Sequence, residues 1–404
     1  MTTPSLSNNQ VPIREVVDAG LLSGAVTMVW QRGEVLQLNE IGYRDVEARQ
    51  PMQRDTVFRI ASMSKPVTSA AVMTLVDEGR LALDDPVTRW LPEFADMAVL
   101  ADPGGPLEAT SPARRPITVD DLLTHRSGLA YEFSVLGPLS RAYRRLPVRG
   151  QPDTWLAELA TLPLVHQPGE RMRYSVAIDV LGVLLSRIEG KEFHKALTER
   201  IFEPLDMRDT GFFVTEEGRR RAATMYQLDE HDQLCHDVMG PPPITPPAFC
   251  HGGGGLWSTV DDYLRFARML LGGGQLDGTR VLSDEAVRLM RTNRLTDEQR
   301  AQPFLGAPYW VGRGFGLGLS VVMDPEKSKP LYGHGGLGTF GWPGAYGTWW
   351  QADPTLDLIL IYLVQNHPTL SADAAAAVAG NASQVKLMTA RPRFVSRTYR
   401  ALTR

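Results

Sequence analysis

Residues 58–65 read Phe58-Arg59-Ile60-Ala61-Ser62-Met63-Ser64-Lys65 and join an expected strand (Thr56–Ile60) to an expected helix that runs to about Glu78. Ser62 and Lys65 are three residues apart, just under one helical turn, so the lysine amine can reach the serine hydroxyl. A serine hydroxyl becomes an effective nucleophile only with such a base nearby. The S-x-x-K spacing therefore predicts a nucleophile at Ser62, activated by Lys65.

Two simpler interpretations have to be weighed against this one. Serine is favoured at the N-cap of helices, so the tetrapeptide alone also fits a structural role for Ser62. A second S-x-x-K, Ser383-Gln384-Val385-Lys386, lies in an alanine-rich segment near the C-terminus. No strand precedes this second copy and no later motif completes a site around it, so we interpret it as a chance match.

The composition is that of an ordinary globular protein. The 404 residues are 43% hydrophobic and 22% charged, which is enough for a large core and one or two domains. The net charge is −4 and no basic block occurs, which argues against a nucleic-acid partner. The longest apolar run, residues 358–364, is too short to span a bilayer, and the first residues do not resemble a signal peptide. We expect a cytoplasmic protein without a membrane partner; the oligomeric state stays open.

The expected elements suggest one sheet made from both ends of the chain. Two strands, residues 25–30 and 34–41, are joined by a turn at Arg32-Gly33, and a helix is expected before them at residues 13–18. Further strands are expected at residues 316–323, 345–352 and 356–364, followed by a helix over residues 372–388.

The residues between these strands show mainly helical patterns. Helices are expected at residues 119–123, 154–159, 178–189 and 260–271. This order predicts an α+β fold in which residues 1–61 and 254–404 form an antiparallel sheet flanked by terminal helices. Residues 62–253 would form a mostly helical domain, with the active site in the cleft between the two parts.

Several separate stretches together resemble the serine β-lactamase superfamily in its class C branch. The similarity is greatest to family VIII carboxylesterases and related acyltransferases, and it covers about residues 20–365. It is carried by the S-x-x-K segment and by the segments 122–129 (Leu-Leu-Thr-His-Arg-Ser-Gly-Leu), 168–175 (Pro-Gly-Glu-Arg-Met-Arg-Tyr-Ser) and 252–261. The resemblance implies a β-lactamase-like fold and an acyl-enzyme on Ser62, with no metal and no organic cofactor.

Tyr174 is the partner base that the resemblance implies. A lysine cation nearby would favour the phenolate, which can take a proton from the serine. By residue type alone, Tyr174 would more simply be a half-buried core residue. The family pattern is Y-x-N, but Val176 stands here in place of the asparagine, so a polar contact to a substrate amide is missing.

The third family element, K-T-G, is absent and two replacements compete for it. His334-Gly335-Gly336 resembles an H-x-G variant, and Trp342-Pro343-Gly344-Ala345 resembles the W-G-G-x variant of family VIII esterases. In the second alignment the backbone N–H groups of Ala345 and Ser62 form the oxyanion hole. His334 could otherwise be an ordinary loop histidine, and Trp342 a packing aromatic.

Two other patterns are weaker. Residues 333–338 match G-x-G-x-x-G, but the glycines and the proline that follow prevent the helix that a dinucleotide site requires. The histidines and cysteines at 231, 235, 236, 250 and 251 fit no common zinc spacing.

The sequence therefore predicts a serine hydrolase that cleaves short-chain carboxylic esters, with a small-molecule ester as its partner. An acyltransferase to an alcohol acceptor and a β-lactamase or amide hydrolase are the enzymatic alternatives. A penicillin-recognising sensor that is acylated without turnover is the non-enzymatic one.

Overall fold

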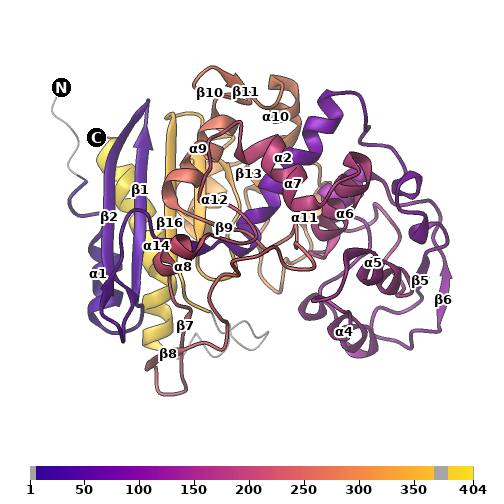
Figure 1. The fold of residues 1–404 in the computed structure, drawn as a ribbon, viewed down its shortest axis with the longest axis horizontal. Coiled ribbons are helices and arrows are strands. Elements are labelled where there is room, and N and C mark those ends of the chain that lie inside the picture. Colours follow the sequence, from indigo (N-terminus) through magenta and orange to yellow (C-terminus); the bar gives the residue numbers. More distant parts are fainter. Residues whose placement is uncertain (1–5, 368–380, 404) are drawn as a thin grey trace.

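A computed structural model describes residues 6–367 and 381–403 of the chain, and an antiparallel eight-stranded sheet is its largest element (Figure 1). The strand order is β12-β13-β14-β15-β16-β1-β2-β3, so the first strand of the chain lies directly beside the last. The sheet is therefore built from both ends of the chain, as the sequence predicts. The strands are β1 (Gly24–Gln31), β2 (Glu34–Asp45), β3 (Gln50–Pro51), β12 (Arg313–Phe315), β13 (Ser320–Val322), β14 (Phe340–Gly341), β15 (Trp349–Asp353) and β16 (Leu358–Val364).

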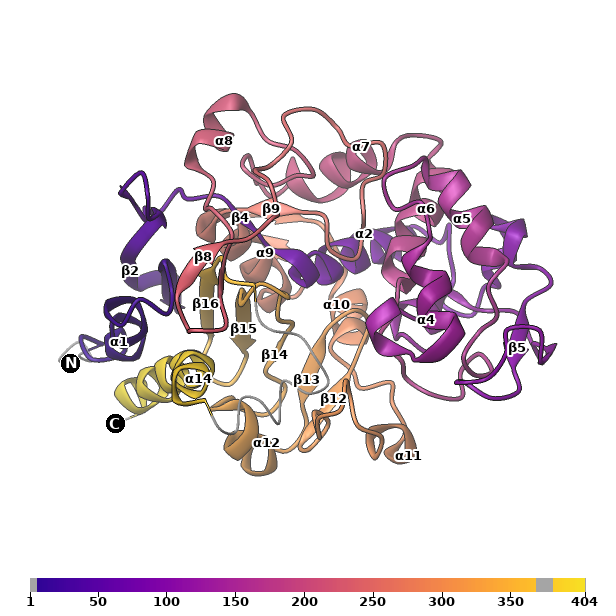
Figure 2. The same cartoon turned by 90° about the horizontal axis from the view of Figure 1, so that it is seen from below.

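The two faces of the sheet are covered by different helices, because successive side chains of a strand point to opposite sides. Leu358 and Leu360 of β16 pack with the terminal helices α1 (Val11–Asp18) and α14 (Ala382–Leu402). Ile359 and Ile361 belong instead to the large core that contains α2 (Ser64–Asp77) and α9 (Val260–Leu271). Figure 2 shows α14 and α9 on opposite sides of β15 and β16.

Helices and short hairpins form the part of the molecule farthest from the termini (Figure 1). The helices here are α3 (Val119–Leu123), α4 (Gly137–Arg144), α5 (Pro152–Ala160), α6 (Ala177–Glu189) and α7 (Phe193–Leu197). The remaining helices are α8 (Glu216–Arg221), α10 (Asp284–Met290), α11 (Asp297–Arg300) and α12 (Pro325–Tyr332). The short strands are β4 (Phe58–Arg59), β5 (Ala98–Leu100), β6 (Thr110–Pro112), β7 (Tyr226–Leu228), β8 (Leu234–His236), β9 (Trp257–Ser258), β10 (Gln275–Leu276) and β11 (Thr279–Arg280). The division into domains at residues 61/62 and 253/254 stays a prediction.

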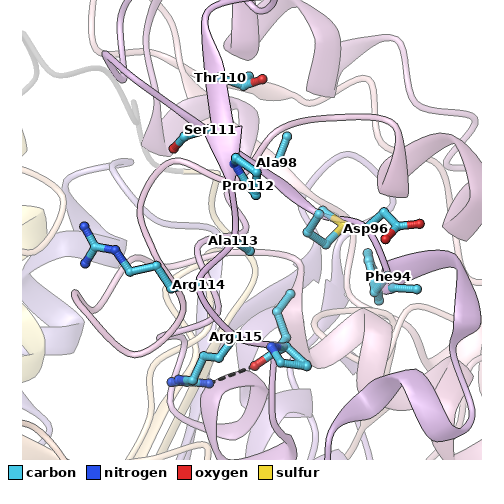
Figure 3. A pocket seen from close by; sticks show the side chains of 13 residues that line it. Phe94, Asp96, Ala98, Thr110, Ser111, Pro112, Ala113, Arg114 and Arg115 are labelled. Atoms are coloured by element: carbon cyan, nitrogen blue, oxygen red, sulfur yellow. Dashed lines mark hydrogen bonds between the residues drawn. The ribbon is translucent and has the colours of Figure 1, made fainter.

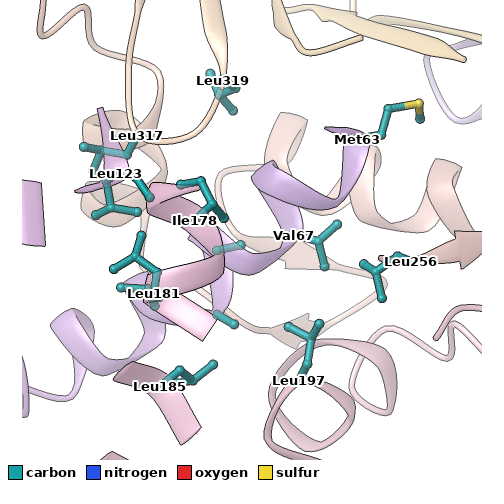
Figure 4. Close-up of a cluster of buried hydrophobic side chains, with 14 of the residues drawn as sticks. Met63, Val67, Leu123, Ile178, Leu181, Leu185, Leu197, Leu256, Leu317 and Leu319 are labelled. Carbon is teal, nitrogen blue, oxygen red and sulfur yellow. The ribbon is translucent and has the colours of Figure 1, made fainter. Parts of the chain in front are cut away.

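Helix α2 is buried around its whole circumference for its first three turns, from Ser64 to Leu75. Figure 4 shows Val67 facing Leu256, with Ile178 and Leu181 of α6 nearby. A helix enclosed on all sides is held rigidly, because closely packed side chains leave no room for it to shift. The N-terminal end of α2 is therefore held in a fixed position, which suits a segment that carries a reacting group.

Three expected elements differ from the structure. The expected strand at residues 316–323 is a hairpin end, in which β12 turns at Gly318 (φ +81°) into β13. The strand expected from residue 345 begins at Trp349, because the preceding residues turn toward the strand before Ser62. The C-terminal helix runs on to Leu402 instead of ending at residue 388; of the expected segment, residues 372–380 lie outside the described residues.

Candidate active site

Ser62 is held at a sharp bend between a short strand and α2. β4 pairs with β9, and the Ile60 N–H donates to the Leu256 carbonyl at 3.0 Å, which fixes the end of the strand. Ala61 then takes a positive φ of +46°, and residues 61–63 form a single 3₁₀ turn (η1, Ala61–Met63) that leads into the helix. Such strained backbone is typical of functional sites that the surrounding structure holds in place.

Lys65 is buried, with 1% of its surface exposed, and all its donor positions have partners. Its Nζ lies 3.2 Å from Ser62 Oγ, 3.1 Å from the Tyr131 hydroxyl and 2.5 Å from the Gly253 carbonyl oxygen. An ammonium group has three N–H donors, so these three acceptors use all of them. The predicted contact between Lys65 and Ser62 is therefore present in the structure.

Tyr174 lies next to this lysine but presents its ring instead of its hydroxyl. Lys65 Nζ is 4.6 Å from the centre of the Tyr174 ring, a cation–π distance. The Tyr174 hydroxyl accepts a hydrogen bond from Trp342 Nε1 at 3.1 Å. A donor aimed at a phenol oxygen stabilises negative charge there, which suits the proton-accepting role that the sequence predicts for Tyr174.

The two candidate replacements for K-T-G lie in different places. Trp342 is buried in an aromatic cluster with Tyr174 and Phe315. His334 stacks on the ring of Tyr399 and its Nδ1 lies 3.2 Å from Ser396 Oγ, both residues of α14. The structure thus brings Trp342 to the predicted catalytic residues and places His334 against the C-terminal helix.

The turn that contains Ala345 lies against the strand that leads to Ser62. The Gly344 N–H donates to the Thr348 carbonyl at 2.8 Å, and Thr348 Oγ1 donates to the Ile60 carbonyl at 3.3 Å. A Cβ added to Gly344 would lie 2.4 Å from the Ile60 carbonyl oxygen, so only glycine allows this close approach. The oxyanion hole between the N–H groups of Ala345 and Ser62 stays a prediction, and this contact supports it.

Replacing Gly344 with alanine is therefore expected to lower kcat about 10²- to 10³-fold, the usual effect of losing one oxyanion donor. KM with p-nitrophenyl butyrate should change much less. Gly240→Ala is the matched control, because a Cβ there meets no atom within 4 Å. Equal kcat values for the two variants, with unchanged thermal unfolding, would remove this turn from the oxyanion hole.

Sequence reasoning did not identify Tyr131, whose hydroxyl lies between Lys65 and the carboxylate of Asp179. Burial, together with the negative charge of Asp179, raises the pKa of Tyr131 well above its ordinary value. Tyr131 is therefore a neutral phenol and not a base. It follows the segment 122–129 by two positions, but no motif marks it.

His125 packs against the candidate catalytic residue Tyr174. Its Nδ1 lies 3.1 Å from Ser175 Oγ, and its ring packs 4.8 Å from the ring of Tyr174. Burial, followed by the charge of Lys65, lowers the pKa of His125 well below its ordinary value. The imidazole is therefore neutral and acts as a packing partner for Tyr174.

A surface hollow of about 450 Å³ lies away from these residues, beside β5 and β6 (Figure 3). Arg115 at its edge is bound to the carboxylate of Asp121 and to the Pro116 carbonyl. None of the predicted site residues lines it.

Within residues 6–367 and 381–403, no group of three or more histidine, cysteine, aspartate or glutamate side chains could hold a metal ion. In the same part of the chain, no helix is long and apolar enough to cross a membrane.

Comparisons with known proteins give the family of this chain. The family model described as Beta-lactamase matches residues 13–383. Protein Rv1367c of Mycobacterium tuberculosis is 70% identical over 98% of this chain and 99% of its own length. Esterase EstB of Burkholderia gladioli is 35% identical over 85% of this chain and 86% of its own length. Among solved structures, EstCE1, described as a hydrolase with promiscuous acyltransferase activity, superposes with a TM-score of 0.78 at 27% identity, covering 98% of both chains.

These matches define a serine hydrolase or acyltransferase of the β-lactamase fold. The chain belongs to the Beta-lactamase family. The α+β fold class expected from the sequence is confirmed, as is the resemblance to the β-lactamase-like superfamily. The family name describes the fold, and it leaves the reaction and the substrate to be argued from the site.

Proposed function

We propose that this protein is a serine carboxylesterase that cleaves short-chain esters through an acyl-enzyme on Ser62. The observation that carries the proposal is the arrangement around Lys65, whose ammonium group lies 3.2 Å from the serine hydroxyl and under the ring of Tyr174. A serine, a lysine and a tyrosine in contact supply the nucleophile and the groups that move its proton.

In the proposed reaction, Ser62 Oγ bonds to the carbonyl carbon of the ester while its proton passes to the base, which is either Lys65 as the neutral amine or Tyr174 as the phenolate. The carbonyl oxygen becomes an oxyanion, held by the N–H groups of Ser62 and Ala345. The carbon–oxygen bond to the alcohol then breaks, and the leaving alcohol takes the same proton. Water repeats the sequence on the acyl-enzyme and releases the carboxylic acid.

The relatives support ester chemistry. Esterase EstB carries that activity in its name, and a neutral ester does not require the lysine or the asparagine that this chain lacks. Acyl transfer to an alcohol is the second candidate, because EstCE1 is described as having promiscuous acyltransferase activity. The two reactions differ only in whether water or an alcohol attacks the acyl-enzyme.

The test is a panel of p-nitrophenyl esters with acyl chains of two to twelve carbons, with and without added short-chain alcohol, followed by intact mass. Rapid turnover with release of the free acid supports the esterase. A preference for forming the alcohol's ester over the acid supports the acyltransferase. A stable adduct without turnover supports a sensor, and no reaction with any ester contradicts the proposal.

A fluorophosphonate probe is expected to label Ser62 and to leave Ser383 unmodified. Ser383 lies in the first turn of α14, which packs on the other face of the sheet from α2. Peptide mapping of the labelled protein locates the adduct, with Ser62→Ala as the control that should take up no label. An adduct on Ser383 would overturn the assignment of the nucleophile.

A further inference from the structure

A buried carboxylate lies beneath the candidate catalytic lysine. Asp179, on the first turn of α6, is 4% exposed. Its Oδ1 accepts a hydrogen bond from the Gly253 N–H at 2.9 Å, and its carboxylate also accepts one from the Tyr131 hydroxyl. Burying a carboxylate costs free energy unless it is hydrogen-bonded and paired with a cation, so a buried aspartate at this position indicates a specific role.

The backbone of Gly253 is hydrogen-bonded both to Asp179 and to Lys65. Its N–H donates to Asp179, while its carbonyl oxygen accepts from Lys65 Nζ at 2.5 Å. A Cβ on Gly253 would lie 2.7 Å from Asp179 Oδ2 and 3.0 Å from the Tyr131 hydroxyl. Only glycine therefore lets this backbone segment sit between the carboxylate, the phenol and the lysine.

His251 completes the charge around Asp179. Its Nε2 lies 2.7 Å from the Val148 carbonyl oxygen, which can only accept a hydrogen bond, and its Nδ1 lies 3.5 Å from Asp179 Oδ1. Both ring nitrogens thus face acceptors, which is the geometry of an imidazolium. The carboxylate consequently lies between two cations, His251 on one side and Lys65 on the other.

The pKa shifts of Asp179 and His251 agree with this geometry. Burial opposes ionisation of Asp179, but the hydrogen bond and charge of His251, with the charge of Lys65, outweigh it and lower the pKa of Asp179. Burial likewise lowers the pKa of His251, but the hydrogen bond and charge of Asp179 outweigh it and leave that pKa raised.

We infer that Asp179 is a positioning residue that orients Lys65, through Gly253 and Tyr131, for proton transfer with Ser62, and that His251 holds Asp179 in place. The inference rests on the proposed function, because it assigns a role within the same reaction. Asp179 bonds to Tyr131 and Gly253, and so acts through other residues and not on the substrate.

Asp179 also sets the charge at the site. Lys65 of α2, Tyr131 before α4 and His251 before β9 are the titratable groups that face it, and Tyr174 and Glu132 face Tyr131 in turn. A nearby anion favours the protonated form of a base that accepts the Ser62 proton. Removing that anion therefore moves deprotonation of the base to lower pH.

The experiment compares Asp179→Asn with wild type, because asparagine keeps the size of the side chain and removes its charge. The rate of Ser62 labelling by a fluorophosphonate and kcat for p-nitrophenyl butyrate are both measured from pH 5 to 9. We expect kcat at neutral pH to fall about 10- to 100-fold with KM within about twofold. The acidic limb of the kcat/KM profile should move to lower pH, on the order of one pH unit.

Asp262→Asn is the matched control. Asp262 is also a buried carboxylate, but it accepts from the Asp209 N–H and the Thr210 hydroxyl and contacts none of the candidate catalytic groups. Its substitution should leave the pH profile unchanged. The second variant is Tyr131→Phe. Adding Asp179→Asn to Tyr131→Phe should lower kcat much less than Asp179→Asn lowers it in the wild-type protein, because both residues act on Lys65 along one path.

The possible outcomes separate this inference from the proposed function. If the wild-type protein takes no label at Ser62, the proposed function fails. If it is labelled and the Asp179→Asn variant shows the wild-type pH profile and kcat, the positioning role of Asp179 fails while the function stands. If Asp179→Asn does not fold, Tyr131→Phe and His251→Gln decide, and wild-type profiles in both would overturn the inference.

Discussion

Lys65→Ala is expected to lower kcat for p-nitrophenyl butyrate by at least about a hundredfold and by up to about 10⁴-fold, the range for loss of a positioned base. The lysine is the only side chain among the described residues that donates to Ser62 Oγ. KM should change little, because the lost interaction acts mainly in the transition state. Lys386→Ala is the matched control, since Lys386 has the same spacing from Ser383 in the second S-x-x-K.

Tyr174→Phe tests the second candidate base. Loss of the Tyr174 hydroxyl should also lower kcat at least about a hundredfold. In the double variant with Lys65→Ala, kcat should fall far less than the product of the two single-variant decreases, because the two residues act as one unit. Near wild-type turnover in Tyr174→Phe would leave Lys65 as the sole base. The hydroxyl accepts from Trp342, so a Trp342→Phe variant should lower kcat as well.

The second large effect concerns the substrate. The protein is expected to hydrolyse p-nitrophenyl acetate or butyrate well and nitrocefin poorly, with kcat/KM for nitrocefin about two to four orders of magnitude below that of a true β-lactamase. No lysine stands at the K-T-G position to bind the β-lactam carboxylate, and Val176 replaces the asparagine that would contact the amide. The lost hydrogen bond to the charged carboxylate contributes about 1.5–3 kcal/mol, and the lost neutral one to the amide about 0.5–1.5 kcal/mol.

The measurement is kcat/KM for nitrocefin beside that for the two esters, on one enzyme preparation. Restoring the amide contact with Val176→Asn supplies the comparison variant, and it should improve nitrocefin hydrolysis more than ester hydrolysis. Should nitrocefin be the better substrate for the wild-type protein, the esterase proposal would give way to the β-lactamase alternative.

Local signals in the sequence located most of the fold. The Arg32-Gly33 turn has positive φ at both residues, +49° and +92°, as a tight hairpin requires. Helix α9 was expected over residues 260–271 and spans them, because Thr259 accepts from the Asp262 N–H as an N-cap. The prediction of one continuous strand over residues 316–323 was wrong, because the chain turns at Gly318, whose N–H donates to the distant Leu123 carbonyl at 3.0 Å.

The candidate site was predictable only where motifs mark it. Ser62 and Lys65 are three residues apart, so local helical geometry is enough to bring them together. Tyr131 is 66 residues from Lys65, and Gly253 is 188 residues from it. Contacts over such distances depend on how α2, α6 and the loop before β9 pack, and a single sequence carries no local pattern for them. The sequence therefore indicates the candidate nucleophile but not the residues that contact the candidate catalytic lysine.

The pairing of β1 with β16 also governs when the protein can fold during synthesis. Ala25 pairs with Val364, so these two neighbouring inner strands of the sheet are separated by more than three hundred residues of chain. A ribosome that adds about 5–20 residues per second needs tens of seconds to connect them. Throughout that time one edge of the β1–β2 hairpin stays unpaired, and exposed strand edges are sites of aggregation. The growing chain is therefore exposed to aggregation until β16 emerges and pairs with β1.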